Sequence, residues 1–191
     1  KKKKYISFFP GSRAVEIKNN MKKLEKIIIK SEKIFSEFDI FILTHDHHEE
    51  NIKRTIKSKK IKIISDYKKK HKIMRETYLA VAASGSVTLE LIKYKVPTIV
   101  FYETHWLTKF IIKLFVKVNY ASLINIINGK EVVPEFLFNN FNTHNIVGSM
   151  KDLIMRKDLR ENQIRYFNNF EKKMLFKNNN PSSLIIKKLK I

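Results

Sequence analysis

The fold is decided by the stretch from Tyr5 to Glu16, YISFFPGSRAVE, in which an apolar run passes through a Pro-Gly turn directly into a helical pattern. The apolar run 5–9 is typical of a short buried strand. From Val15 to about Phe35, apolar residues recur three or four positions apart, which predicts one long helix. A strand, a tight turn and a helix form the repeating unit of α/β proteins that are built on a parallel sheet.

The same alternation continues outward from this stretch. Further strands are predicted at 39–44, 60–65, 79–83 and 97–102, with helices at 45–58, 67–76 and 84–95 between them. After Tyr102 the pattern is mostly helical, at about 105–118, 133–138, 143–155, 158–176 and 182–189. We therefore predict an α/β fold with a Rossmann-like parallel sheet and helices on both faces over 1–176, followed by a helical C-terminal tail over 177–191.

Composition narrows the possible functions. The chain of 191 residues has a formal net charge of +21 and contains no cysteine, which excludes disulfides and a thiol nucleophile. A field of this sign attracts nucleic acid, anionic lipid or nucleotide phosphates. Most of the basic residues are lysines spread along the chain, so a compositional bias at surface positions explains the charge equally well. The chain opens on Lys1–Lys4 and one short strand, so we expect no signal peptide and expect a piece of a longer protein.

The first candidate site is the turn from Phe9 to Arg13, which joins the first strand to the long helix. Backbone N–H groups at a helix start, the Ser12 hydroxyl and the Arg13 guanidinium together suit a diphosphate. In the alternative interpretation, Ser12 only caps the helix and Arg13 is a surface residue.

The second candidate site is ASGSVTLE, residues 83–90, which also leads from a strand into a helix. Gly85 permits a phosphate to approach the backbone, Ser84 and Ser86 add hydroxyl donors, and Glu90 suits ribose hydroxyls. The alternative is a serine-capped helix with Glu90 on a solvated face. No lysine follows the turn, so it is not a P-loop, and its spacing differs from that of a nucleophile elbow.

The third candidate site lies in residues 120–135, where Asn125 is a polar residue within an apolar run. Its side chain either satisfies a buried backbone group or points at a ligand, and the local pattern is compatible with both.

Taken in order, these segments resemble the lipid-A-disaccharide synthase family, inverting glycosyltransferases of the GT-B architecture. The resemblance runs from Tyr5 to about Leu137 and is carried by FPGSR with Glu16, by ASGSVTLE followed by VPTIVFY, by LTKFIIKLFVKVNYASL and by NIINGKEVVPEFL. It implies transfer of 2,3-diacylglucosamine from UDP-2,3-diacylglucosamine to 2,3-diacylglucosamine-1-phosphate (lipid X), which gives lipid A disaccharide 1-phosphate and UDP.

The resemblance also implies that two halves of the enzyme have different functions. Only the carboxyl-terminal, UDP-binding half of the family is matched, so the N-terminal acceptor domain, which would supply the general base, is expected on the rest of the polypeptide or on a separate chain. This half alone is expected to be inactive. The UDP-sugar is a substrate, and no cofactor or metal is expected.

The implied site residues follow the three segments. UDP binding would involve Ser12, Arg13, Ser84, Gly85, Ser86, Glu90 and Asn125, of which Arg13 and Asn125 would serve the leaving group and the donor during catalysis. Two positions depart from the family pattern. Glu103 stands where a basic residue is usual, and Ile124 stands where proline usually precedes the asparagine.

A basic stripe suggests where the protein works. The predicted helix carries a stripe of Lys109, Lys113 and Lys117, with Trp106 at its end, and much of its remaining surface is apolar. Such a helix suits an anionic bilayer surface, although packing on the sheet with solvated lysines explains it equally well. With a lipid substrate, we expect a cytoplasmic protein that is peripheral at the cytoplasmic face of the inner membrane.

Two further classes compete with this interpretation. His45 and His47 supply the first half of the HxHxDH motif of zinc hydrolases, but Glu49 and Glu50 replace its second half, and a capped helix start explains the segment. A basic nucleic-acid-binding or membrane-surface-binding α/β protein without catalysis is the alternative function. No nucleic-acid-binding motif occurs and the basic residues are not clustered, so no nucleic-acid partner is expected.

Overall fold

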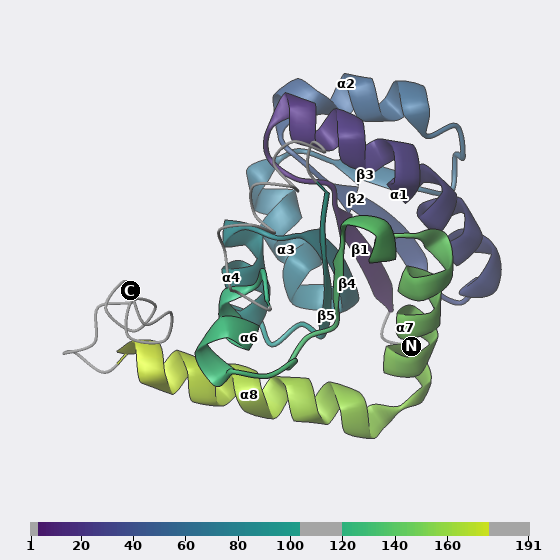
Figure 1. Cartoon of the computed structure of the whole chain (residues 1–191). Helices are drawn as coiled ribbons and strands as arrows, with labels where there is room; N and C mark the ends of the chain where they lie inside the picture. The colour runs from purple at the N-terminus through teal and green to yellow at the C-terminus, as the bar shows by residue number, and fades with distance from the viewer. Residues whose placement is uncertain (1–3, 104–119, 176–191) are drawn as a thin grey trace.

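A computed structural model describes residues 4–103 and 120–175. These residues form a parallel sheet with the order β3-β2-β1-β4-β5-β6 (Figure 1). Its strands are β1 (Tyr5–Phe9), β2 (Asp39–Leu43), β3 (Lys62–Ile64), β4 (Thr77–Ala83), β5 (Thr98–Tyr102) and β6 (Glu135–Leu137). Neighbouring strands pair in parallel throughout, as the strand–helix alternation predicted.

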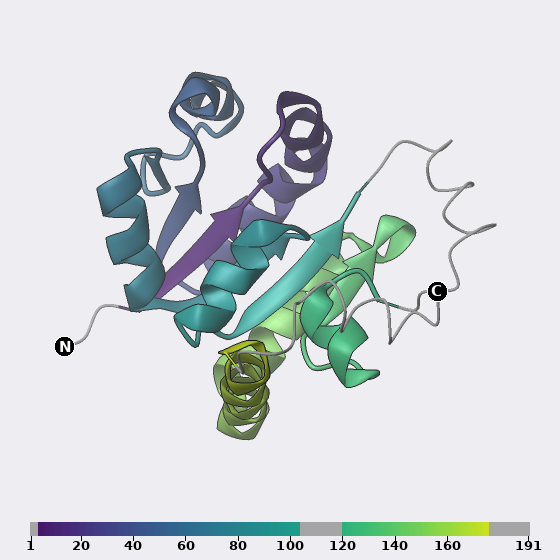
Figure 2. The ribbon, with the colours of Figure 1, turned by 90° about the vertical axis from the view of Figure 1, so that its left-hand side faces the viewer.

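Helices cover both faces of the sheet (Figure 1, Figure 2). One face carries α1 (Ala14–Ile34), α2 (Asp46–Thr55) and α7 (Thr143–Met155), which share a core with Ile6 and Phe8 of β1. The other carries α3 (Tyr67–Glu76), α4 (Ser86–Lys93), α6 (Leu123–Asn128) and α8 (Lys157–Leu175). Phe8 and Phe9 enter opposite cores because successive side chains of a strand point to opposite faces. The predicted Rossmann-like fold with helices on both faces is confirmed.

The order of the strands brings two turns together. β1 leads through α1 to β2 on one side, whereas β4 leads through α4 to β5 on the other side. β1 and β4 are themselves hydrogen-bonded neighbours, with Phe9 opposite Ala82. The turns that follow these two strands therefore open side by side at the carboxyl edge of the sheet, which is the switch point where such folds bind ligands.

The predicted helix at 133–138 is wrong. Residues Glu135–Leu137 form strand β6, followed by a short 3-10 turn, η1 (Phe138–Asn140). The edge of β5 determines this outcome, because Phe136 pairs with Phe101 and the backbone N–H of Val100 donates to the carbonyl of Pro134 at 2.9 Å. The segment before β6 contains α6, which ends at Gly129 in the left-handed conformation, with φ of 64°.

Several expectations fall outside the described residues. These are the tail over 177–191, the predicted helix at 182–189, and the predicted helix at about 105–118 with its membrane-contact residues Trp106, Lys109, Lys113 and Lys117. Within the described part of the chain, none of the helices combines the length and the apolarity that crossing a bilayer requires.

Candidate functional site

Two adjoining hollows open at the carboxyl edge of the sheet. The turns after β1 and β4 contribute to both, through Ser12 and through Ser84, Gly85 and Ser86. We call the first the inner hollow; it is also lined by Phe9, Gly11, Glu16, Leu43, Thr44, His45, Lys70, Ala83, Val87 and Glu90. We call the second the outer hollow; it is also lined by Arg13, Val15, Glu16, Asn19, Tyr102 and Glu103. The two turns thus converge on one site, as the sequence predicted.

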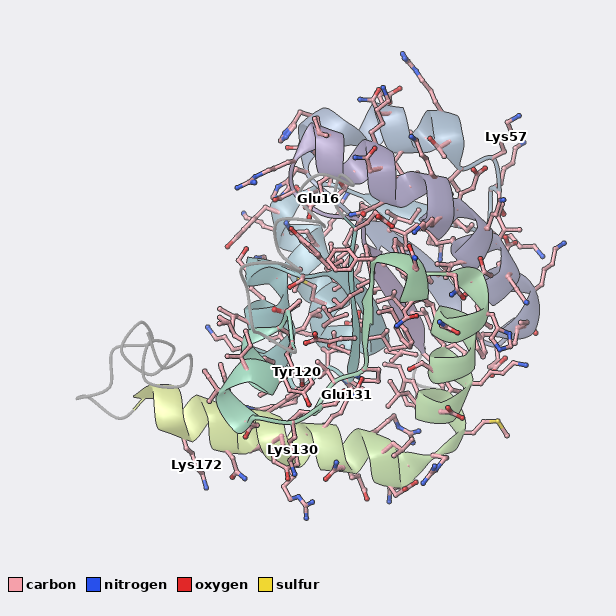
Figure 3. The ribbon with its side chains drawn as sticks, in the orientation of Figure 1. Glu16, Lys57, Tyr120, Lys130, Glu131 and Lys172 are labelled. Atoms are coloured by element: carbon pink, nitrogen blue, oxygen red, sulfur yellow. The ribbon has the colours of Figure 1, made fainter. Side chains whose placement is uncertain are left out.

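The turn after β1 is closed by its own helix. Oε2 of Glu16 accepts hydrogen bonds from the backbone N–H groups of Ser12, at 3.0 Å, and Arg13, at 3.4 Å. Gly11 has φ of 123°, and a Cβ at this position would lie 2.6 Å from Cδ of Glu16. Glu16 lies at the start of α1 (Figure 3). A glutamate three residues after the cap that reaches back to satisfy free N–H groups is a capping arrangement.

This closure revises one expectation. The sequence suggested that backbone N–H groups around the start of α1 would meet a diphosphate, but Glu16 already occupies those of Ser12 and Arg13, directly before the helix. The turn is held further by Nδ2 of Asn20, which donates to the carbonyl of Pro10 at 2.7 Å, and by the His48 ring, 3.1 Å from the carbonyl oxygen of Ser12. What the turn offers to the site is the exposed Ser12 and Arg13 side chains.

The turn after β4 is open. Gly85 caps α4 in an extended conformation, with φ of 163°, and no side chain caps this helix. A Cβ on Gly85 would meet no described atom within 4 Å. The first N–H groups of a helix have no partner inside the helix and carry the positive end of its dipole. Gly85 and Ser86 are exposed, so the start of α4 faces both hollows as a place for an anion.

Ser84 differs from Ser86. Its hydroxyl donates to the carbonyl of Ala121 at 3.1 Å, and its backbone N–H donates to the carbonyl of Phe101 at 2.8 Å. Ser84 lines both hollows, but its hydroxyl is engaged in tying the turn to the segment that leads into α6. The predicted hydroxyl donor to a phosphate is therefore better supplied by Ser86.

Asn125 satisfies backbone groups rather than facing either hollow. Its side chain is fully buried, and its Oδ1 accepts from the backbone N–H groups of Val132 and Val133 at 2.7 and 3.0 Å. Its Nδ2 donates to the carbonyl of Val133 and to Oε1 of Glu135, both at 2.8 Å. Of the two roles that the sequence left open for Asn125, this geometry matches the structural one, and direct ligand contact has no support in it.

Glu103 lines the outer hollow, where the family pattern has a basic residue, and its side chain is only 11% exposed. It pairs with Lys23 of α1, whose Nζ also donates to the carbonyl of Phe138 at 3.2 Å and lies 5.1 Å from the ring centroid of Phe141. A paired carboxylate repels an anion less than an unpaired one would. Lys23 thus offsets the negative charge that Glu103 brings to the outer hollow.

The inner hollow is also lined by Thr44, His45 and Lys70, which the sequence did not predict as residues of the UDP site. Of these, only His45 had been considered, as a candidate zinc ligand. Partial burial lowers the pKa of His45 below its ordinary value, and the Lys70 ammonium, His47 and His48 lower it further, in part opposed by Asp46. A polar residue directly after the buried strand β2 was the available signal, because such positions reach the carboxyl edge of the sheet.

The rings of the clustered histidines lie against one another, stacked for His45 and His47 and tilted for His47 and His48. The ring centroids of His47 and His48 lie 3.9 Å apart, and those of His45 and His47 lie 5.9 Å apart. Over residues 4–103 and 120–175, no group of three His, Asp or Glu side chains is placed to share a metal ion. The zinc-hydrolase interpretation therefore has no support in the described part of the chain.

Comparison with known proteins identifies relatives in sequence. The model of the family described as lipid-A-disaccharide synthetase matches residues 1–189. The lipid-A-disaccharide synthase of Rickettsia prowazekii is 33% identical over 150 residues, which cover 78% of this chain and 40% of the relative. That of Bradyrhizobium diazoefficiens is 27% identical over 177 residues, which cover 92% of this chain and 45% of the relative. The chain thus spans less than half the length of these relatives.

Solved structures share the fold. A UDP-GlcNAc 2-epimerase from Neisseria meningitidis bound to UDP-GlcNAc aligns with a TM-score of 0.58 at 16% identity, covering 93% of this chain and 45% of that one. A UDP-GlcNAc 2-epimerase from Methanocaldococcus jannaschii in complex with UDP-GlcNAc and UDP aligns with a TM-score of 0.56 at 18% identity, covering 89% and 46%. At this identity the likeness shows the fold alone.

Proposed function

Because the chain belongs to the lipid-A-disaccharide synthetase family, we propose that it supplies the UDP-sugar-binding half of a glycosyltransferase of lipid A biosynthesis. The donor would be UDP-2,3-diacylglucosamine and the acceptor lipid X, with lipid A disaccharide 1-phosphate and UDP as products. One observation carries the proposal: the turns after β1 and β4 line the same two hollows, and the uncapped start of α4 lies there with Arg13.

The chemical role of this half is to bind the donor and stabilise the leaving group. When the bond between sugar and diphosphate breaks, negative charge grows on the departing UDP. Fixed donors that meet this charge lower the barrier. Here they are the Arg13 guanidinium, the Ser86 hydroxyl and the first N–H groups of α4, while Glu90 accepts from ribose hydroxyls. Asn125 contributes indirectly, since its hydrogen bonds hold the segment that joins α6 to β6.

We propose that no divalent metal is needed to hold UDP, because Arg13 and the dipole of α4 provide the positive charge that the diphosphate requires. Equal affinity for UDP in EDTA and in Mg²⁺ is the expected result. A strong gain in affinity with Mg²⁺ would contradict it.

The rest of the family's length would supply the acceptor-binding half with the general base, on the same polypeptide or on a separate chain. The carboxyl edge offers it a contact surface. Among the described residues, the exposed large apolar side chains include Val15, Tyr67 and Leu89, which are 73%, 70% and 36% exposed. Each lies in the first turn of a helix that begins at this edge, namely α1, α3 and α4. We expect this half alone to bind UDP without catalysing transfer.

The cellular location remains a proposal that follows from the lipid substrates: peripheral association with the cytoplasmic face of the inner membrane. Its test is flotation with anionic liposomes. Loss of flotation when Lys109, Lys113 and Lys117 are changed to Glu would support the proposal, and unchanged flotation would contradict it.

Calorimetry with UDP tests the proposed site. Arg13→Ala should weaken binding about tenfold to a hundredfold, because a hydrogen bond to a charged group is worth about 1.5–3 kcal/mol. Glu90→Ala should weaken it about tenfold through the lost ribose contact. Arg54→Ala removes the same charge from an exposed position of α2 outside both hollows and should leave affinity unchanged. Equal affinities for all four proteins would remove the site assignment.

A further inference from the structure

The inner hollow is lined by Thr44, a residue whose buried hydroxyl has no partner in the described part of the chain. Thr44 follows β2 and is only 2% exposed. Its backbone N–H donates to the carbonyl of Ile64 at 3.0 Å, which fixes the main chain beside β3. Its Oγ1 has no hydrogen-bond partner among the described residues. A buried hydroxyl without a partner costs free energy, so such a group in a hollow is a sign of a missing ligand.

The chemistry of the inner hollow differs from that of the outer one. Its apolar walls come from Phe9, Leu43 and Ala83, which are all less than 5% exposed. Glu90 adds a carboxylate that the outer hollow lacks, Lys70 and His45 add basic side chains, and Glu16 borders both hollows. Apolar walls suit a planar heterocycle, and the Glu90 carboxylate suits hydroxyl donors such as those of a ribose. The outer hollow is instead lined by Arg13 and by Glu103, whose carboxylate pairs with Lys23.

We propose that the inner hollow takes the nucleoside part of the ligand and that Oγ1 of Thr44 hydrogen-bonds to it. The inference rests on the proposed function and adds a recognition residue to it. The start of α4, which lines both hollows, marks the boundary, with the diphosphate on the outer side and the nucleoside on the inner side. Thr44 would then contribute to choosing a nucleotide over a bare diphosphate, because only the nucleoside can satisfy its hydroxyl.

The test is Thr44→Val, which removes the hydroxyl at nearly constant shape. Affinity for UDP should fall about threefold to tenfold, the value of one neutral hydrogen bond. Affinity for inorganic pyrophosphate should stay unchanged, because pyrophosphate has no group that reaches the inner hollow. The urea midpoint of the ligand-free protein should stay the same or rise, since the variant loses a buried polar group that has no partner.

The matched control is Thr98→Val, in a threonine of equal burial at the start of β5. Oγ1 of Thr98 donates to the carbonyl of Val96 at 2.7 Å, so this variant should unfold at lower urea and bind UDP normally. The inference is overturned if Thr44→Val binds UDP as wild type does, if it loses UDP and pyrophosphate equally, or if it is destabilised as much as Thr98→Val. If wild type binds neither UDP nor pyrophosphate, the proposed function fails first.

Discussion

The two turns that build the site occupy equivalent places, each between a strand and a helix, but the turn after β1 is closed and the turn after β4 is open. Both lead from a central strand into a helix, and both place a glycine and a serine at the carboxyl edge of the sheet. The Gly11 turn is filled by Glu16, which bonds to two of its N–H groups. The Gly85 turn has no capping side chain and leaves space where a Cβ would stand. Gly11 therefore serves the protein's own packing, whereas Gly85 leaves space that we propose a ligand fills.

The largest effect is expected from Gly11→Ala. With φ of 123° and a Cβ 2.6 Å from Cδ of Glu16, alanine is strained and collides with the capping side chain. We expect a loss of about 2–3 kcal/mol of unfolding free energy, measured by urea denaturation. Gly148→Ala, inside α7 where a Cβ meets nothing within 4 Å, should instead stabilise by about 0.5–1 kcal/mol. Equal stability of both variants would show that the Gly11 turn is not constrained.

Gly85→Ala should separate binding from stability. The protein itself leaves room for the methyl group, so unfolding free energy should stay within about 0.5 kcal/mol of wild type. The methyl would stand where a phosphate approaches the start of α4, so calorimetry should show UDP bound about tenfold more weakly, or about 1.4 kcal/mol. Unchanged affinity would mean that no ligand group comes close to Gly85.

Glu16→Ala should open the closed turn. The loss of a capping side chain costs about 1 kcal/mol of stability. The two freed N–H groups and the removed negative charge make the site more attractive to an anion, so UDP affinity should be retained or increased. A loss of UDP binding in a protein that remains folded would assign Glu16 a role in the ligand site itself.

The smallest effect concerns His45, whose pKa is lowered in the free protein. His45 lines the inner hollow, so a diphosphate bound at the start of α4 favours the imidazolium only at a distance and raises this pKa modestly. Binding then takes up part of a proton, and UDP affinity gains as pH falls. UDP itself also titrates in this pH range, so the quantity to measure is the ratio of UDP affinities of wild type and His45→Gln. We expect this ratio to rise about threefold between pH 7.5 and pH 6, because the interaction of an exposed side chain is screened by solvent. Parallel pH profiles for the two proteins would contradict the effect.

The same shift has a consequence for stability. With the folded pKa of His45 below its unfolded value, the unfolded chain binds more protons as pH falls below about 6.5. The contribution of His45 to stability is therefore present above that pH and is lost in acid. His45→Gln should flatten this part of the stability profile in urea denaturation.

The local periodicity of apolar residues was enough to predict most of the fold and the positions of both turns. Apolar spacing located the strands and helices up to Tyr102, because each of these elements carries its own pattern. It failed at β6, where Val133 and Phe136 read as part of a helix but the open edge of β5 recruits the segment as a strand. Whether this segment forms a strand depends on its pairing with β5, which is distant in sequence, so the local pattern could not predict it.

The chemistry of the site was harder to predict than its position. Glu16 carried a readable signal, since a glutamate three residues after a cap is a known helix-start pattern. Other features depend on tertiary contacts. The Ser84 hydroxyl is engaged by a hydrogen bond to the carbonyl of Ala121, and the Asn125 side chain is engaged by the backbone N–H groups of Val132 and Val133. The unpaired Thr44 hydroxyl is visible only once burial is known.

We propose that the diphosphate is bound by the open turn at Gly85 and not by the closed turn at Gly11. Titrating the ¹⁵N-labelled chain with UDP and following backbone amides by NMR tests it most directly. We predict saturable shifts at Ser86 and Val87 in the first turn of α4, with the Ser12 and Arg13 amides still protected by Glu16. Shifts confined to Ser12 and Arg13, or none that saturate, would contradict the account.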